Sequence, residues 1–260
     1  MALVAILGGA TVLAGCGAQS ASDVQTVATA IRELETKGAQ FQMSEVLTQT
    51  GGDIPKGKQA YIKFAAGGAE RDDNAYLVLK LSNARNQPLG GYDLVINDSD
   101  LYVRPHGSTR IWYSGPAAVA NHFYPGVRLN LLRDTVLLAA KQSSKGPSYS
   151  NGSFVRQYTI VPGADQLEQL QSTVVAPGNE GKYLKSASGS IDFFIGLNGN
   201  HLERVNIHLV GTDPDTSLRQ EFRSSLVFSK LGKVPPVAIP TKALPVPASN
   251  LFSTAQPSTG

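Results

Sequence analysis

Residues 188–211 read SGSIDFFIGLNGNHLERVNIHLVG, and this stretch decides the fold. Asn198-Gly199 is a strong hairpin signal, because both residue types tolerate the positive φ angles that a two-residue turn requires. Apolar and polar residues alternate after the turn, with Val205, Ile207 and Leu209 in one phase. The stretch therefore predicts two antiparallel strands that share one apolar face.

The same alternation recurs along most of the chain. It occurs in FQMSEVLTQT (41–50), KQAYIKFAAGG (58–68), AYLVLKLS (75–82), GYDLVINDSDLYVRP (91–105), SFVRQYTIV (153–161) and SLRQEFRSSLVFS (217–229). Tight turns separate several of these segments, and Asn97-Asp98-Ser99-Asp100 is one of them. We expect antiparallel meanders.

Helical spacing interrupts the strands in three places. The segment 22–38 places Val24, Val27, Ile31 and Leu34 on one side and ends at Gly38, which predicts one amphipathic helix. The segment 116–142 predicts two helical pieces, broken at Pro125-Gly126, and 163–175 a short helix. The stretch SSKGPSYSNG at 143–152 is expected to be a loop.

The single cysteine of the chain follows an apolar N-terminal run, MALVAILGGATVLAGC. The run is too short to span a bilayer and has the length of a signal-peptide core. Its end, Leu13-Ala14-Gly15-Cys16, resembles the bacterial lipobox, in which the cysteine receives a diacylglyceryl group and becomes the new N-terminus. Cys16 is therefore the predicted lipidation site. The usual preceding Lys or Arg is absent, which leaves open whether Met1 is the natural start.

These features divide the chain into four parts. We expect a lipoprotein signal peptide at 1–15, a lipidated tether at 16–22, a single folded domain at 23–240, for which the resemblance given below implies a lipid-binding half-barrel, and a proline-rich disordered tail at 241–260. One domain suits the 260 residues and 42% hydrophobic content. We expect the protein on the extracytoplasmic face of the bacterial cell membrane, held there by its lipid.

The predicted element order favours an α+β fold, a large curved antiparallel sheet whose concave apolar face is covered by helices. With the lipobox, YDLVINDSDLYVRP, IWYSG, the central helices, the 193–211 hairpin and VFSKLGKVPPVAIP in this order, the chain resembles the LppX/LprG-type bacterial lipoproteins, relatives of the LolA/LolB lipoprotein carriers. The resemblance covers nearly the whole mature chain. It implies a half-barrel whose hydrophobic cavity holds the acyl chains of a lipid, a glycolipid or a lipoprotein anchor.

The apolar side chains of this face are the predicted cavity lining, although each of them would equally suit a filled core. They are Leu79, Leu94, Ile96, Leu129, Leu132, Val136, Phe193, Ile195, Val205, Ile207, Leu209, Phe222, Leu226 and Phe228. Four aromatic residues of the central segment are predicted at the mouth of the cavity, because Tyr and Trp suit a membrane interface. They are Trp112, Tyr113, Phe123 and Tyr124.

Other classes of function find less support in the residues. The net charge of +3 is small and scattered, so nucleic acid is not an expected partner. The four histidines lack metal-ligand spacing, and no nucleophile elbow or phosphate-binding loop occurs, so neither a metal, a cofactor nor an enzymatic activity is expected. The predicted function is to transport or present a lipid. The alternatives are a structural or adaptor lipoprotein of the envelope with a filled core, and a LolB-like acceptor of lipoprotein anchors.

Overall fold

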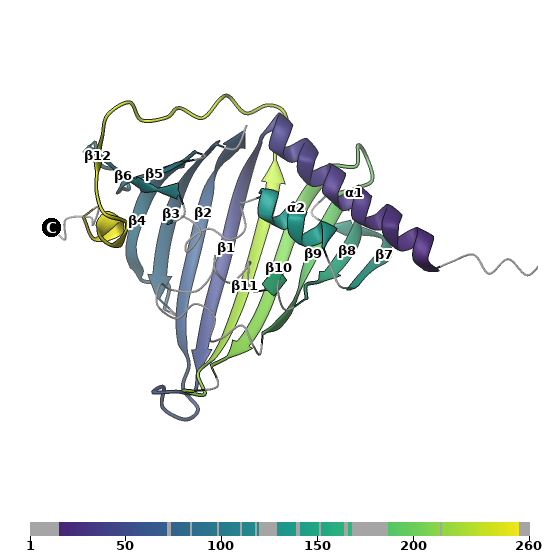
Figure 1. Ribbon diagram of the computed structural model, residues 1–260, viewed down its shortest axis with the longest axis horizontal. Helices are drawn as coiled ribbons and strands as arrows, with labels where there is room; N and C mark the ends of the chain where they lie inside the picture. The colour runs from purple at the N-terminus through teal and green to yellow at the C-terminus, as the bar shows by residue number, and fades with distance from the viewer. Residues whose placement is uncertain are drawn as a thin grey trace, which may run out of the picture.

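The computed structural model describes residues 16–71, 74–83, 85–97, 99–109, 111–117, 119, 129–138, 141–150, 152–163, 166–167, 187–213 and 215–254. In this part of the chain, twelve strands form one open sheet in the order β12-β6-β5-β4-β3-β2-β1-β11-β10-β9-β8-β7 (Figure 1). The neighbours pair antiparallel except for β12 and β6, which are parallel. The predicted α+β half-barrel is confirmed.

The strands make two meanders that meet in the middle of the sheet. The first comprises β1 (Ala39–Thr50), β2 (Ala60–Arg71), β3 (Asn74–Asn83), β4 (Pro88–Ile96), β5 (Asp100–Pro105) and β6 (Trp112–Pro116), and the second comprises β7 (Lys141–Ser150), β8 (Ser153–Val161), β9 (Ser188–Gly196), β10 (Leu202–Thr212) and β11 (Arg219–Ser229). Strand β1 pairs with β11 over its length, from Gln40 opposite Ser229 to Thr50 opposite Arg219. This central pairing joins the first strand of one meander to the last strand of the other.

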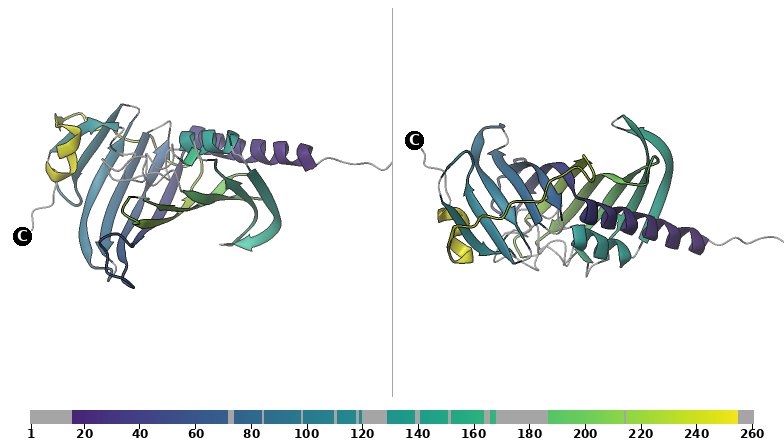
Figure 2. Two further views of the ribbon diagram at one scale, coloured as in Figure 1. Left: turned by 60° about the horizontal axis from the view of Figure 1, so that its bottom comes forward. Right: turned by 90° about the horizontal axis from the view of Figure 1, so that it is seen from above.

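Alternation gives the sheet two different faces. We call the inner face the one on which the hydrophobic core lies; on β1 it carries Phe41, Met43 and Leu47, and opposite them on β11 Phe228, Leu226 and Phe222. The outer face carries the residues between them, such as Arg223 and Val227. Figure 2 shows the sheet bending around the side on which the helices lie.

Two helices cover part of the inner face. Helix α1 (Cys16–Lys37) and helix α2 (Leu129–Leu137) pack on each other and lie over the second meander (Figures 1 and 2). Both contribute buried side chains to the core, among them Ile31 from α1 and Leu132 from α2. Helix α1 ends where predicted, because Gly38 adopts a φ of 72° and its N–H bonds the carbonyl oxygen of Leu34.

The N-terminal tether predicted at 16–22 is wrong in its conformation. These residues belong to α1, whose N-terminal end projects past the edge strand β7 in Figure 1. Small residues such as Ala18 and Ala21 have a high helix propensity, which the prediction of a tether outside the helix underrated.

The disordered tail predicted at 241–260 is also wrong for its described part. After Gly232 the chain crosses the sheet and forms β12 (Ala243–Pro245), the 3₁₀ turn η3 (Ala248–Asn250) and α4 (Leu251–Thr254). Leu251 is fully buried, and Phe252 contacts Tyr92 edge to face with ring centroids 5.2 Å apart. Proline content indicated an extended chain correctly, but two apolar side chains near the end anchor it to the sheet.

The loop predicted at 143–152 is likewise wrong, because 141–150 form the edge strand β7. Its side chains are mostly exposed, so they lack the apolar alternation by which the other strands were recognised. Of the short helix predicted at 163–175, only Gly163, Gln166 and Leu167 are described, and the last two are helical. The first helical piece predicted within 116–142 falls mostly outside the described residues.

Two neighbouring glycines of β2 offer a test of the sheet packing. A Cβ atom at Gly68 would lie 1.9 Å from the carbonyl oxygen of Tyr76, whereas one at Gly67 would meet nothing nearer than 3.9 Å. We expect Gly68→Ala to lower the free energy of unfolding by ~1–3 kcal/mol, because the backbone of β3 must move. The matched change Gly67→Ala should stay within ~0.5 kcal/mol of the wild type. Urea denaturation measures both, and equal effects would show that strand spacing adjusts freely here.

Candidate functional site

The predicted cavity residues come together on the inner face. Twelve of the fourteen lie in one hydrophobic cluster, and Ile96 packs against it. The twelve are Leu79, Leu94, Leu132, Val136, Phe193, Ile195, Val205, Ile207, Leu209, Phe222, Leu226 and Phe228. Leu129 is the first residue of α2, and its side chain lies outside the described residues.

Burial is uneven across this face. Under α1 and α2 the side chains are fully covered; Phe193, Val205 and Leu226 have no exposed surface. On the first meander Leu77, Leu79 and Leu94 are fully buried as well, whereas Leu47, Phe64 and Leu81 point inward by their register but stay only partly buried. These three side chains occupy neighbouring positions on β1, β2 and β3 and form a stretch of apolar surface on the inside of the sheet, which we call the half-open face: Leu47, Phe64 and Leu81.

One carboxyl group lies on the inner face between these two regions. Glu45 follows Met43 and precedes Leu47 in the inward phase of β1, and only 2% of it is exposed. Ser224, its partner across the β1–β11 ladder, donates a hydrogen bond from Oγ to Glu45 Oε1 at 3.0 Å. Burial raises the pKa of Glu45 to about 8, although the Ser224 bond opposes the shift. The carboxyl is therefore neutral at neutral pH.

Sequence reasoning missed Glu45, although its signal was present. The residue occupies an inward position of the alternating segment 41–50, where an acid breaks the apolar pattern. An acid at such a position is a sign of a buried, protonated carboxyl rather than of a solvent-facing one.

The structure separates the predicted mouth residues. Tyr113 packs against the inner hydrophobic cluster, whereas Trp112 points to the outer face, where the guanidinium of Arg104 lies 4.4 Å from its ring centroid. Trp112 also lines a groove of about 760 Å³ between the outer face and the segment Val234–Lys242. Phe123 and Tyr124 lie outside the described residues. A common mouth formed by Trp112 and Tyr113 is therefore wrong, because adjacent residues of a strand face opposite sides.

The remaining sequence-based expectations concern the anchor and the histidines. Cys16 is the first residue of α1, at the end that projects from the sheet (Figure 1). His208 lies on the outer face and bonds Glu221 at 2.9 Å, while His106 Nδ1 lies 2.7 Å from Asp93 Oδ1. Among the described residues, three or more side chains of the His, Cys, Asp and Glu types never gather as a metal site would need. None of the described helices combines the length and the hydropathy of a membrane span.

The fold and the site together define a class: an open antiparallel half-barrel with a helix-covered apolar inner face. No family model matches the chain, and no curated protein matches it either. Solved structures do. Lipoprotein LppX of Mycobacterium tuberculosis is similar at 16% identity and a TM-score of 0.45, over 86% of this chain and 100% of that one.

Two further structures show the same likeness. LprF from Mycobacterium bovis has 16% identity and a TM-score of 0.46 over 87% of this chain and 98% of its own. A LolA superfamily protein from Nitrosomonas europaea has 7% identity and a TM-score of 0.31, with coverages of 82% and 94%. Proteins of the LppX and LolA types, which the sequence resembles, are thus among the solved structures that are similar to this chain.

The buried carboxyl makes a pH-dependent stability testable. Below the ordinary pKa of 4.5, Glu45 is neutral in both the folded and the unfolded chain, so it imposes no penalty. As the pH rises from there toward 8, only the unfolded chain ionises, so stability is lost by up to ~1.4 kcal/mol per pH unit. We expect Glu45→Gln to remove this decline in urea unfolding measured between pH 4.5 and 8.

Glu221→Gln provides the contrast for that experiment. The Arg223 hydrogen bond lowers the pKa of Glu221, so its contribution is lost as the pH falls, in the opposite direction. Identical pH slopes for the wild type and Glu45→Gln would show that Glu45 is ionised in the folded protein.

Proposed function

We propose that this protein is a membrane-anchored, extracytoplasmic lipoprotein that binds a lipid or glycolipid and carries or presents it, with no chemical step. The half-open face is the observation that supports this function: Leu47, Phe64 and Leu81 are apolar, point inward and stay only partly buried. Partly exposed apolar groups inside a curved sheet offer an acyl chain a surface that water solvates poorly.

Desolvation supplies the driving force in this proposal. Each methylene that moves from water onto the inner face gains ~0.8 kcal/mol, and the gain is similar to that in a bilayer. The free energy of moving an acyl chain between the membrane and the protein is therefore close to zero, as a carrier requires. The neutral state of Glu45 fits this role, because an ionised carboxylate beside an acyl chain would cost several kcal/mol.

The proposed anchor acts through α1. Lipidation at Cys16 would place two acyl chains at the projecting end of a helix of 22 residues. At ~1.5 Å per residue the helix spans about 33 Å. The anchor would thus hold the half-barrel on a stiff arm rather than on a flexible tether. Two acyl chains suffice for stable membrane attachment.

A second candidate function is a structural or adaptor lipoprotein with a filled core. The second meander favours it, because Phe193, Val205, Leu132 and Val136 have no exposed surface beneath the two helices. A LolB-like acceptor of lipoprotein anchors would use the half-open face in the same way as a lipid carrier. Bound material in the purified protein distinguishes these functions.

The first test is native mass spectrometry of a Cys16→Ala variant purified from its host without detergent. We expect a stoichiometric lipid that organic extraction releases. A protein anchor in its place would favour the acceptor. A bare mass, together with no uptake of added fatty acid, would favour the adaptor and contradict the carrier.

Two neighbouring residues of β1 test where the lipid binds. Leu47 belongs to the half-open face, whereas Val46 points outward from the same strand toward Lys63 and Arg223. We expect Leu47→Gln to weaken binding of the fluorescent fatty acid cis-parinaric acid by ~5–100-fold, because an amide placed against an acyl chain costs ~1–3 kcal/mol. Val46→Gln should leave binding within about twofold of the wild type. If the two variants bind equally well, the acyl chain does not lie on the half-open face.

A further inference from the structure

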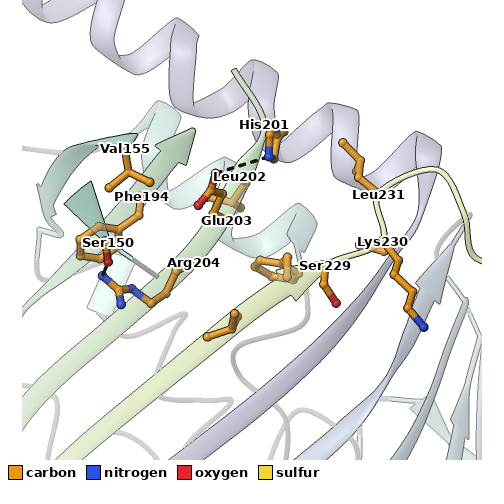
Figure 3. Close-up of a pocket in the computed structure, with 13 residues that line it drawn as sticks. Ser150, Val155, Phe194, His201, Leu202, Glu203, Arg204, Ser229, Lys230 and Leu231 are labelled. Atoms are coloured by element: carbon orange, nitrogen blue, oxygen red, sulfur yellow. Dashed lines mark hydrogen bonds and ion pairs between the residues drawn. The ribbon is translucent and has the colours of Figure 1, made fainter. Parts of the chain in front are cut away.

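A second concavity lies at the end of the sheet where β10 begins and β11 ends. We call it the rim pocket; it holds about 200 Å³. Its walls include outward-facing side chains of three neighbouring strands, Phe194, Arg204 and Val227, and also Ser150 and Val155 (Figure 3). The half-open face belongs to the other side of the sheet, so the rim pocket is a separate site.

Arg204 is the central polar residue of the rim pocket. Its guanidinium lies 3.9 Å from the ring centroid of Phe194, and its Nη2 donates to Ser150 Oγ at 3.1 Å (Figure 3). Its Nε–H is buried and, among the described residues, has no acceptor. The cation has thus lost part of its water without replacing all of its hydrogen bonds, which is unfavourable by itself.

The charge of Arg204 is also uncompensated in the described part of the chain. Three other arginines there pair with carboxylates: Arg104 with Asp93 at 3.0 Å, Arg133 with Glu35, and Arg223 with Glu221. Arg204 bonds only the neutral hydroxyl of Ser150. A partly desolvated guanidinium beside a cavity, without a carboxylate, is the arrangement that an anionic ligand completes.

The neighbouring acid does not fill this role. Glu203 is bonded by Ser153 Oγ and lies 3.5 Å from His201 Nε2 (Figure 3). These contacts direct its carboxylate toward His201 and Ser153, and no ion pair joins it to Arg204 within the described residues. Lys230 lines the pocket as well and adds a second positive charge at its margin.

We propose that the rim pocket binds a phosphate group. The N–H groups of the planar Arg204 guanidinium would donate the main charge-assisted hydrogen bonds, and the Ser150 hydroxyl would make a further contact. Phe194, Val155 and Val227 limit access of water, which strengthens these bonds. The phosphate belongs either to a membrane lipid headgroup or to a free, water-soluble compound, since both present the same oxygens.

The experiment titrates the Cys16→Ala protein with inorganic phosphate at constant ionic strength, with chloride replacing phosphate, and follows binding by calorimetry. We expect saturable binding by the wild type. Arg204→Gln should weaken it by at least ~10-fold, since a hydrogen bond to a charged group contributes ~1.5–3 kcal/mol. Arg223→Gln is the matched control, an exposed outer-face arginine that has its own carboxylate, and it should bind like the wild type.

Vesicles distinguish the two sources of phosphate. Binding to phosphatidylglycerol vesicles that Arg204→Gln reduces and Arg223→Gln preserves would identify a headgroup. Saturable phosphate binding without such a vesicle effect would identify a soluble ligand. Arg204→Lys keeps the positive charge but removes the planar guanidinium, and it serves as a second variant in case Arg204→Gln fails to fold. It should bind with intermediate affinity.

Absence of saturable phosphate binding, together with equal vesicle binding by the wild type and Arg204→Gln, would overturn the proposal. The role of Arg204 would then be limited to its contact with the Phe194 ring. Because the assay does not involve fatty acid uptake, its failure is distinguishable from a failure of the lipid-carrier function.

Discussion

A single sheet with one apolar face must cover that face, and the rest of this structure depends on how it does so. In a sandwich, a second sheet would supply the cover over the whole width. Here the described cover consists of α1 and α2, which lie over the second meander, and of the short α4, whose Leu251 and Phe252 pack against the first. Curvature of the sheet brings the two halves partly toward each other but does not close them. Burial of the inner face is complete at Val205 and Leu79 and partial at Phe64.

The pairing of β1 with β11 determines which residues share that face. It places Glu45 opposite Ser224 and Met43 opposite Leu226, although the partners are far apart in sequence. A shift of one residue would turn the apolar set of β11 toward solvent and carry Arg223 inward. The apolar pairs above and below Glu45 therefore hold the register, and the Glu45–Ser224 bond satisfies the polar pair between them. A neutral acid is tolerated there because its partner lies directly across the ladder.

Much of the fold was predictable from local patterns, since alternation and turn residues are properties of short segments. The hairpin of β9 and β10, the Gly38 helix end and the inward phase of Leu226 and Phe228 are examples. The connection of that hairpin is longer than the predicted two-residue turn, and its positive φ angles fall at Gly199 and Asn200 instead of at Asn198. Edge strand β7 was not predictable, because an exposed strand carries no apolar alternation. The ordered C-terminal segment was missed for a different reason: Leu251 becomes an anchor because α4 packs on β6 and joins the core cluster, and β6 is distant in sequence. Likewise, the sequence placed Trp112 and Tyr113 together, although neighbours on a strand face opposite sides.

Adjacent residues on these strands face opposite sides of the sheet, and the two sides differ in their chemistry. Phe193 belongs to the buried core, and the next residue, Phe194, supports the cation of Arg204; in the same way Val205 is buried inside while Arg204 lies in the rim pocket. An apolar chain and an anion need opposite surroundings, one free of charge and one that supplies it. On a helix, residues on opposite faces are about two positions apart, whereas on a strand neighbouring residues face opposite sides. The register that buries Phe193 and Val205 thus also fixes where Arg204 points, so the buried core of the second meander and the proposed phosphate pocket depend on the same β9–β10 pairing.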